Sequence, residues 1–344
     1  MPAGLRVLSA GLHTTVQDLG RTGWQRLGVP VSGALDGVAL RLGNALVGNP
    51  PGMAGLEFLY SGAELEIAAD AVRIALAGSG AAVLSLAEGA RAVAGWQSMT
   101  LERGERIRIV LGRDAVCAYL ALEGGIAVPP VLGSASTYVR GGFGGFGGRA
   151  LREGDVVPLA LAHAPPRVEL RLPTPPAGAA GDPVRIVLGP QCDCFTDEAV
   201  AALLAAEFRV SKSADRMGMR LDGPALRHRR GWDIVSDAIA TGAIQVPGSG
   251  QPILLLVDHQ TTGGYPKIAT VISADLPVVG RRRPGDVIRF TAVTIEEAEQ
   301  LAREQKHWLE EQIAALEPAL ASGGLDLASL YAGNLISGVV SGSE

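Results

Sequence analysis

Short apolar segments separated by turn residues make up most of the first half of the chain. They are Leu5–Ser9, Ala54–Tyr60, Ala63–Ala68, Val72–Ala77, Ala82–Leu86, Arg106–Val110 and Ala115–Leu120. Segments of this length, repeated at intervals of roughly 8–12 residues, are typical of β-sandwiches and barrels. The same pattern returns at Val184–Leu188, Ile253–Val257 and Ile268–Ile272. The sequence therefore predicts a mainly β protein.

Three other segments have the apolar spacing of helices. The first runs from Asp36, a candidate N-cap, to Gly48, a candidate C-cap. Thr196 is expected to cap a second helix that continues to about Phe208. Thr294 stands three residues before Glu297, the spacing of a capping box, and a long helical pattern follows. A C-terminal helix is therefore predicted.

The length of 344 residues favours two domains. A proline-rich stretch around residues 162–183 has little periodic pattern, so we take it as the connection between them. This divides the chain into an N-terminal domain (1–165), a connection (166–183), a C-terminal domain (184–292), and a C-terminal helix and tail (293–344). The tail segment Leu335–Val340 is expected to dock on a partner.

A polar loop at residues 258–267 contains far more side-chain chemistry than a turn needs. A turn requires only Gly, Pro, Asn or Asp, whereas this loop carries a carboxylate, an imidazole, an amide, hydroxyls, a phenol and an ammonium group. Lysine is rare in the chain, with three residues against 27 arginines, which gives weight to the lysine in this loop. The predicted site residues here are Gln245, Gln251, Gln260, Thr261 and Tyr265 for substrate binding and Lys267 for catalysis.

Two further polar clusters lie in glycine-containing turns. Asp18 and Arg21 follow the first strand, and Asp215, Arg216 and Arg220 lie within six residues of one another. Guanidinium groups bind carboxylate or phosphoryl groups in a bidentate manner. We predict Asp18 and Asp215 as catalytic residues and the three arginines as substrate-binding residues. Both clusters have a structural alternative, because salt bridges also hold such turns together.

These clusters are expected to converge in one cleft between the two domains, since clefts of this kind are common ligand sites. The prediction includes Asp18, Arg21, Asp215, Arg216, Gln260, Thr261 and Lys267. Structural salt bridges alone would leave them scattered.

Composition narrows the functional class. Hydrophobic residues make up 47% of the chain, charged residues 19%, and the net charge is -5 without a basic block, so disorder and nucleic-acid binding are disfavoured. No apolar run reaches the length of a membrane span and the start lacks a signal-peptide pattern, so a cytoplasmic protein is expected.

Neither the three cysteines nor the five histidines have the spacing of a metal site. Residues 142–147 match GxGxxG, but no helical pattern follows, so this stretch is interpreted as a flexible lid or a contact between subunits.

The polar clusters also carry a family resemblance. The stretches TTVQDLGRTG (14–23), GVPVSGALD (28–36), SADRMGMRLDG (213–223), GAIQVPGSGQP (242–252) and DHQTTGGYPKIATVISADLP (258–277) occur in the order seen in one family. The chain resembles the allophanate hydrolase subunit 2 family, also called the biotin-dependent carboxyltransferase family. The resemblance implies two cyclophilin-like β-barrel domains.

The resemblance also implies partners and three alternative functions. One is a subunit of an ATP-dependent 5-oxoprolinase, inactive alone, which acts with a subunit 1 protein and a LamB/YcsF-type third subunit to open 5-oxoproline to glutamate. Another is a carboxyltransferase component of a urea carboxylase or amidolyase system. The chain has neither a GxxxxGK phosphate loop nor a Met-Lys-Met biotin site, so ATP would be used together with the partners and biotin would come from another chain. The third is a non-catalytic antagonist that binds a kinase inhibitor.

Overall fold

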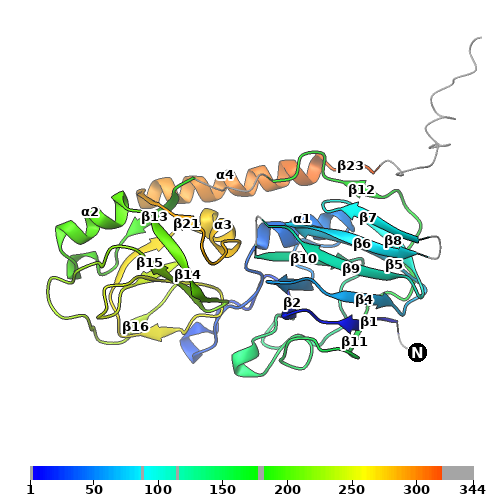
Figure 1. The fold of residues 1–344 in the computed structure, drawn as a ribbon, viewed down its shortest axis with the longest axis horizontal. Coiled ribbons are helices and arrows are strands. Elements are labelled where there is room, and N and C mark those ends of the chain that lie inside the picture. The colour runs from blue at the N-terminus through cyan, green and yellow to red at the C-terminus, as the bar shows by residue number, and fades with distance from the viewer. Residues whose placement is uncertain (1–2, 87–88, 114–115, 177–181, 320–344) are drawn as a thin grey trace, which may run out of the picture.

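The computed structural model of the protein describes residues 3–86, 89–113, 116–176 and 182–319, so the predicted docking segment Leu335–Val340 lies outside the described residues. Two β-rich domains lie side by side, and one long helix passes over both (Figure 1). The protein is mainly β with a C-terminal helix, as predicted. None of the helices in the described part of the chain is long and apolar enough to cross a membrane.

The first domain contains two antiparallel sheets that face each other. Its strands are β1 (Gly4–Ser9), β2 (His13–Gln17), β3 (Gly55–Leu59), β4 (Glu64–Ile67), β5 (Ala71–Gly78), β6 (Gly80–Leu86), β7 (Gly89–Ala94), β8 (Ser98–Glu102), β9 (Arg106–Leu111), β10 (Cys117–Leu122) and β11 (Val156–Pro158). One sheet has the order β11-β1-β4-β9-β6-β7 and the other the order β2-β3-β10-β5-β8. Alternating side chains of the two sheets, such as Leu5, Leu65, Leu56 and Leu120, meet in one buried core.

Helix α1 (Gly37–Leu46) covers strands β5 and β10 of the first domain. Asp36 is its N-cap, as predicted, and its carboxylate accepts hydrogen bonds from the backbone N–H groups of Val38 and Ala39. Two short 3₁₀ helices, Gln25–Leu27 and Val139–Gly141, lie in the loops of this domain.

The second domain is built around one eight-stranded sheet that curls into a nearly closed barrel. Its strands are β13 (Val184–Leu188), β14 (Phe208–Asp215), β15 (Gly218–Asp222), β17 (Ala243–Gln245), β18 (Ile253–Leu255), β20 (Lys267–Val271), β21 (Val287–Ile288) and β22 (Phe290–Ala292), in the order β21-β14-β15-β18-β17-β20-β13-β22. A separate ribbon pairs β16 (Asp237–Ala238) with β19 (Thr262–Gly263). The helices are α2 (Asp197–Ala205) and α3 (Leu276–Gly280), with 3₁₀ turns at Cys192–Cys194 and Ser273–Asp275.

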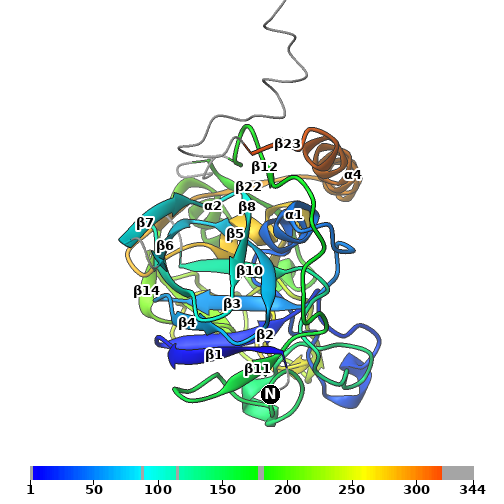
Figure 2. The same ribbon diagram turned by 90° about the vertical axis from the view of Figure 1, so that its right-hand side faces the viewer.

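Helix α4 (Ile295–Ala314) lies against α1 of the first domain and the Ser273–Asp275 turn of the second (Figure 2). The predicted capping box is confirmed: Thr294 and Glu297 bond to each other's backbone N–H groups. After the helix, β23 (Glu317–Pro318) pairs with β12 (Leu170–Arg171) of the connection between the domains. The helix and this short ribbon therefore tie the two domains together on one side.

The two domains share a continuous apolar core. Leu35, Leu40 and Tyr119 of the first domain belong to the same buried cluster as Ile244 and Val279 of the second. Because the contact is apolar and buried, it fixes how the domains sit relative to each other.

The structure differs from the sequence pattern at one helix end and at several strands that the pattern does not predict, among them β2, β14, β15 and β17. The second helix ends at Ala205 rather than near Phe208, because Phe208 begins strand β14 and its ring is fully buried. The pattern also does not predict strands β7 and β8, because small and polar residues interrupt the apolar alternation of both segments.

Candidate functional site

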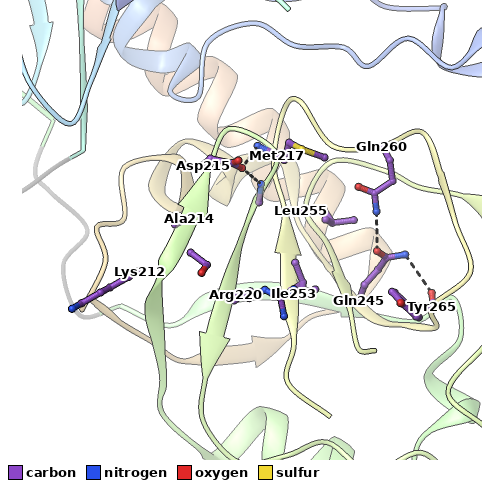
Figure 3. A pocket seen from close by; sticks show the side chains of 12 residues that line it. Lys212, Ala214, Asp215, Met217, Arg220, Gln245, Ile253, Leu255, Gln260 and Tyr265 are labelled. Atoms are coloured by element: carbon purple, nitrogen blue, oxygen red, sulfur yellow. Dashed lines mark hydrogen bonds between the residues drawn. The ribbon is translucent and has the colours of Figure 1, made fainter. Parts of the chain in front are cut away.

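A cavity of about 450 Å³ lies on the second domain, over the hairpin formed by β14 and β15 (Figure 3). Its lining residues are Lys212, Ser213, Ala214, Asp215, Met217, Gly218, Arg220, Gln245, Ile253, Leu255, Gln260 and Tyr265. We call it the Asp215 pocket. Its volume falls within the roughly 300–1,000 Å³ of ordinary small-molecule sites.

Strand alternation explains why these side chains face the pocket. In β15 the side chain of Arg220 points into the pocket, whereas Met219 and Leu221 on either side of it are buried in the core. Arg220 is paired in register with Ile253 of β18, and Ile253 is paired with Gln245 of β17. A guanidinium, an aliphatic chain and an amide therefore lie side by side across three strands.

Fixed polar groups surround this row. Gln260 Nε2 donates to Gln245 Oε1 at 3.2 Å, and Gln245 Nε2 donates to the carbonyl oxygen of Tyr265 at 3.4 Å (Figure 3). Asp215 Oδ1 accepts a hydrogen bond from the backbone N–H of Met217 at 2.7 Å, which orients the carboxylate at the hairpin turn. The pocket thus combines two amides and a carboxylate that are held by hydrogen bonds, and the Tyr265 phenol lines it as well.

Arg216 does not face the pocket, because its side chain is buried in an ion-pair cluster between the domains. Its Nε donates to Asp258 Oδ2 at 2.8 Å, its Nη1 to Glu57 Oε1, and its Nη2 to the carbonyl oxygen of Gly33 at 2.6 Å. Burial would lower the pKa of this guanidinium, but the carboxylates of Asp258 and Glu57 outweigh that effect and raise it. These contacts leave Arg216 outside the lining of the Asp215 pocket and favour the structural alternative, a salt-bridge cluster, over the predicted role in substrate binding.

Asp18 and Arg21 stabilise a loop of the first domain. The Asp18 carboxylate accepts hydrogen bonds from the hydroxyls of Ser134 and Ser136, and Arg21 Nη2 donates to the carbonyl oxygen of Ser136. The Arg21 guanidinium lies 5.0 Å from the centre of the Phe143 ring. Burial lowers the pKa of Arg21. These contacts fix the loop and leave both side chains outside the lining of the Asp215 pocket.

The glycine-rich stretch 141–148 is closely packed, which corrects its interpretation as a flexible lid. A Cβ atom on Gly144 would collide with the carbonyl oxygen of Ser136, and one on Gly148 would collide with the backbone of Gly142. Gly148 N also donates to the carbonyl oxygen of Gly144 at 2.8 Å. Glycine is needed here because backbones approach each other, at φ of 74° for Gly144 and 70° for Gly148.

Lys267 is buried beside the pocket rather than in it. Its ammonium group donates to Asp237 Oδ2 at 2.9 Å and to the carbonyl oxygen of Ala238 at 3.2 Å. The first of these hydrogen bonds lowers the pKa of the Asp237 carboxyl. Lys267 therefore holds strand β16 against β20, and it is not among the lining residues.

The remaining predicted residues, Thr261 and Gln251, are also outside the lining. The backbone carbonyl of Thr261 accepts from Ile239 N at 3.0 Å, and Gln251 Nε2 donates to the carbonyl oxygen of Gly223 at 3.3 Å. Both contacts shape loops around the pocket.

The Asp215 pocket therefore brings together Asp215, Arg220, Gln245, Gln260 and Tyr265. It does not include Asp18 and Arg21 of the first domain, so the prediction of one cleft lined by both clusters is not met by this cavity. Sequence reasoning missed Lys212, which lines the pocket. The rarity of lysine is the available signal, and it applies to Lys212 as much as to Lys267. Among the described residues, no group of three or more His, Cys, Asp or Glu could hold a metal ion.

His259, in the polar loop at residues 258–267, makes the stability of the fold depend on pH. Its fully buried ring bonds through Nδ1 to the carbonyl oxygen of Gln260 at 2.6 Å and through Nε2 to Thr241 Oγ1 at 3.2 Å. A carbonyl only accepts, so Nδ1 carries the proton and the ring is satisfied when neutral. Burial lowers its pKa below the usual 6.5. The unfolded chain then binds a proton below pH 6.5 that the folded chain does not, so stability is lost as the pH falls through that value.

We therefore expect His259→Gln to reduce the loss of unfolding free energy between pH 7.5 and 5.5, by about 1 kcal/mol. Urea denaturation at the two pH values measures this difference. His307→Gln, on the exposed face of α4, is the matched control and should leave it unchanged. An equal pH dependence in wild type and His259→Gln would contradict the assignment.

Comparison with known proteins identifies the family. Residues 27–292 match the family model described as carboxyltransferase domain, subdomain A and B. The chain belongs to this family. It is 35% identical over 307 residues to the C subunit of 5-oxoprolinase from Escherichia coli (strain K12), covering 89% of this chain and 97% of that protein. The corresponding C subunit from Haemophilus influenzae is 34% identical over 305 residues, covering 89% and 96%.

Solved structures of the family share the fold. The crystal structure of Kluyveromyces lactis urea carboxylase matches with a TM-score of 0.82 at 29% identity, covering 94% of this chain and 30% of that one. The K. lactis urea amidolyase matches with a TM-score of 0.81 at 30% identity, covering 90% and 20%. The chain thus spans less than a third of these urea enzymes, but nearly all of the length of the 5-oxoprolinase C subunits.

Proposed function

We propose that the chain is a subunit of an ATP-dependent 5-oxoprolinase complex that opens 5-oxoproline to glutamate. The observation that carries the proposal is the coverage in both directions. The matches to the 5-oxoprolinase C subunits span 89% of this chain and 96–97% of the length of those subunits. In keeping with a subunit of this kind, the chain acts with a subunit 1 partner and a LamB/YcsF-type third subunit, and it is inactive alone.

The Asp215 pocket supports this substrate class. 5-Oxoproline is a small ring with one amide N–H, one amide carbonyl and one carboxylate. Arg220 pairs with the carboxylate, and the carboxylate of Asp215 accepts the lactam N–H. The Tyr265 phenol and the Gln260 amide donate to the lactam oxygen, where negative charge grows during ring opening. The aliphatic side chain of Ile253 packs against the ring.

ATP supplies the driving force for this reaction. Its γ-phosphoryl group is transferred to the lactam oxygen, which activates the ring carbon, and the N–H proton passes to Asp215. Water then adds to this carbon, the C–N bond opens, and Asp215 returns the proton to the leaving amine. The acyl phosphate that remains is hydrolysed by a second water. The net reaction consumes 5-oxoproline, ATP and two water molecules and yields glutamate, ADP and phosphate.

The test is turnover by the reconstituted complex. Purified chain mixed with its authentic subunit 1 and LamB/YcsF-type partners is expected to release ADP and glutamate in equal amounts, and only when 5-oxoproline is present. The chain alone should release neither. This proposal would be contradicted if the complex with all partners showed no turnover, or if it released ADP independently of 5-oxoproline.

Carboxyl transfer is a second candidate, favoured by the family model and by the urea carboxylase structure. In that reaction Asp215 orients a urea-like acceptor and Arg220 holds the transferred carboxylate. The activated carboxyl group comes from carboxybiotin, whose Met-Lys-Met site lies outside these 344 residues. Labelled carboxylate that passes from a biotinylated carrier to urea in the presence of this chain would support this function and displace the first.

A further inference from the structure

A short turn of the first domain, Tyr138–Phe143, extends towards the second domain. Its ends are paired, with Tyr138 N donating to the carbonyl oxygen of Phe143 at 3.0 Å and Phe143 N donating back at 3.4 Å. Gly142 N closes the turn onto the carbonyl oxygen of Val139 at 3.1 Å, with Gly142 at φ 67°. Arg140 is at the centre of this turn. Its backbone is therefore held by hydrogen bonds on both sides.

Packing holds the base of the turn. The rings of Tyr138 and Phe143 meet edge to face with 5.5 Å between their centres, and the buried Arg21 guanidinium lies over the Phe143 ring. Arg21 itself is bonded to the loop at Ser136. Arg21, predicted to bind substrate, instead supports the turn that positions Arg140.

Arg140 reaches the edge of the Asp215 pocket. Its Nη1 lies against the sulfur of Met217, which lines the pocket two residues after Asp215. A second contact is close by, because Tyr60 Oη donates to the carbonyl oxygen of Ala214, another lining residue, at 2.5 Å. Tyr60 holds an unusual backbone conformation, with φ at 68°. The first domain thus touches the rim at two fixed points.

The charges around the rim are unbalanced. Lys212 and Arg220 line the pocket and make no ion pair within the described residues, and Asp215 is the single carboxylate of the lining. Arg140 is exposed and likewise has no carboxylate partner in the part of the chain that the structure describes. The lining therefore has two cations and one carboxylate, and Arg140 adds a third cation at the rim, which suits a ligand with more than one negative oxygen.

We propose that Arg140 is a specificity-determining residue that the first domain contributes to the Asp215 pocket, where it binds an anionic oxygen group of the ligand. The group is a carboxylate or a phosphoryl group, since a guanidinium binds both in the same bidentate way. This inference deepens the proposed function, and its substrate measurements rest on that function. When Arg140 of the first domain binds the ligand, residues of both domains contact it, so the pocket becomes a site between the domains.

The test uses the reconstituted complex with Arg140→Gln. We expect the KM for the ligand that carries the bound group to rise about 10- to 100-fold, the usual effect of losing a charged hydrogen bond, while kcat changes little. A rise in the KM for 5-oxoproline identifies the carboxylate, and a rise in the KM for ATP identifies the phosphoryl group. Arg140→Lys keeps the charge without the bidentate geometry, so its KM should fall between those of wild type and Arg140→Gln.

Arg108→Gln is the matched control, because Arg108 is an exposed arginine of the same domain on strand β9. Unchanged KM values for both ligands in Arg140→Gln would overturn the inference and leave the proposed function intact. If the wild-type complex has no 5-oxoprolinase activity, the proposed function fails. The binding of pyrophosphate to the isolated chain then tests whether Arg140 binds an anionic group. Weaker pyrophosphate binding by Arg140→Gln than by Arg108→Gln supports the inference, whereas equal or absent binding overturns it.

Discussion

Arg216→Met is expected to lower the free energy of unfolding by about 3–5 kcal/mol, the cost of removing one partner from a buried ion pair. The variant leaves the carboxylates of Glu57 and Asp258 without their shared cation. Glu57 is fully buried and keeps hydrogen bonds from Leu35 N at 2.9 Å and Tyr119 Oη at 2.7 Å, but these do not neutralise its charge. Chemical denaturation followed by circular dichroism measures the change.

Two further variants separate charge from packing in this experiment. Arg209→Met removes an exposed arginine of the same hairpin and should stay within about 0.5 kcal/mol of wild type. Adding Glu57→Gln and Asp258→Asn to Arg216→Met removes the two carboxylate charges that have lost their cation, and it should restore much of the lost stability. A loss below about 1 kcal/mol in Arg216→Met would show that the cluster is not the electrostatic link between the domains.

Asp215→Asn is expected to lower kcat of the assembled complex by about 10²-fold or more, because in the proposed reaction the substituted side chain no longer accepts the lactam proton or stabilises charge in the transition state. The amide oxygen of asparagine still accepts the hydrogen bonds that Asp215 Oδ1 receives from Met217 N at 2.7 Å and Gly218 N at 3.3 Å. The hairpin should therefore keep its shape. Steady-state turnover and co-purification with the partners measure chemistry and assembly separately.

Asp222→Asn is the control for this variant, since Asp222 is an exposed carboxylate at the far end of the same hairpin. It should leave kcat unchanged. If Asp215→Asn also has wild-type turnover, the Asp215 pocket is not the place of the chemistry. A non-catalytic role, such as binding and antagonising a kinase inhibitor, then becomes the better account of the chain.

Local pattern is sufficient for the longer apolar strands and for helices α1, α2 and α4. The apolar segment Val184–Leu188 predicts β13 with its bounds, and Thr294 with Glu297 predicts the start of α4. Such signals are contained within a few residues, because a cap bonds to the next turn and a strand alternates with a period of two. The mainly β class follows from the same evidence.

Tertiary structure decides that Arg216 is buried whereas Arg220, in the same motif, faces the pocket. Arg216 and Arg220 are four residues apart and look equivalent in sequence, but the first is in the hairpin turn and the second is within β15. Arg216 is buried because Glu57, 159 positions earlier, lies opposite it once the domains pack. Arg220 faces the pocket because pairing with Ile253 sets which face of the strand it occupies.

The same distinction applies to the rest of the site. Local sequence indicates that Asp215, Gln245, Gln260 and Tyr265 carry chemistry beyond the needs of a turn. It does not indicate that Arg140 belongs with them, since the pocket residue it contacts is Met217, 77 positions later in the chain. Contacts over such distances depend on how two whole domains pack, and packing is set by the summed burial of many apolar side chains rather than by any local motif.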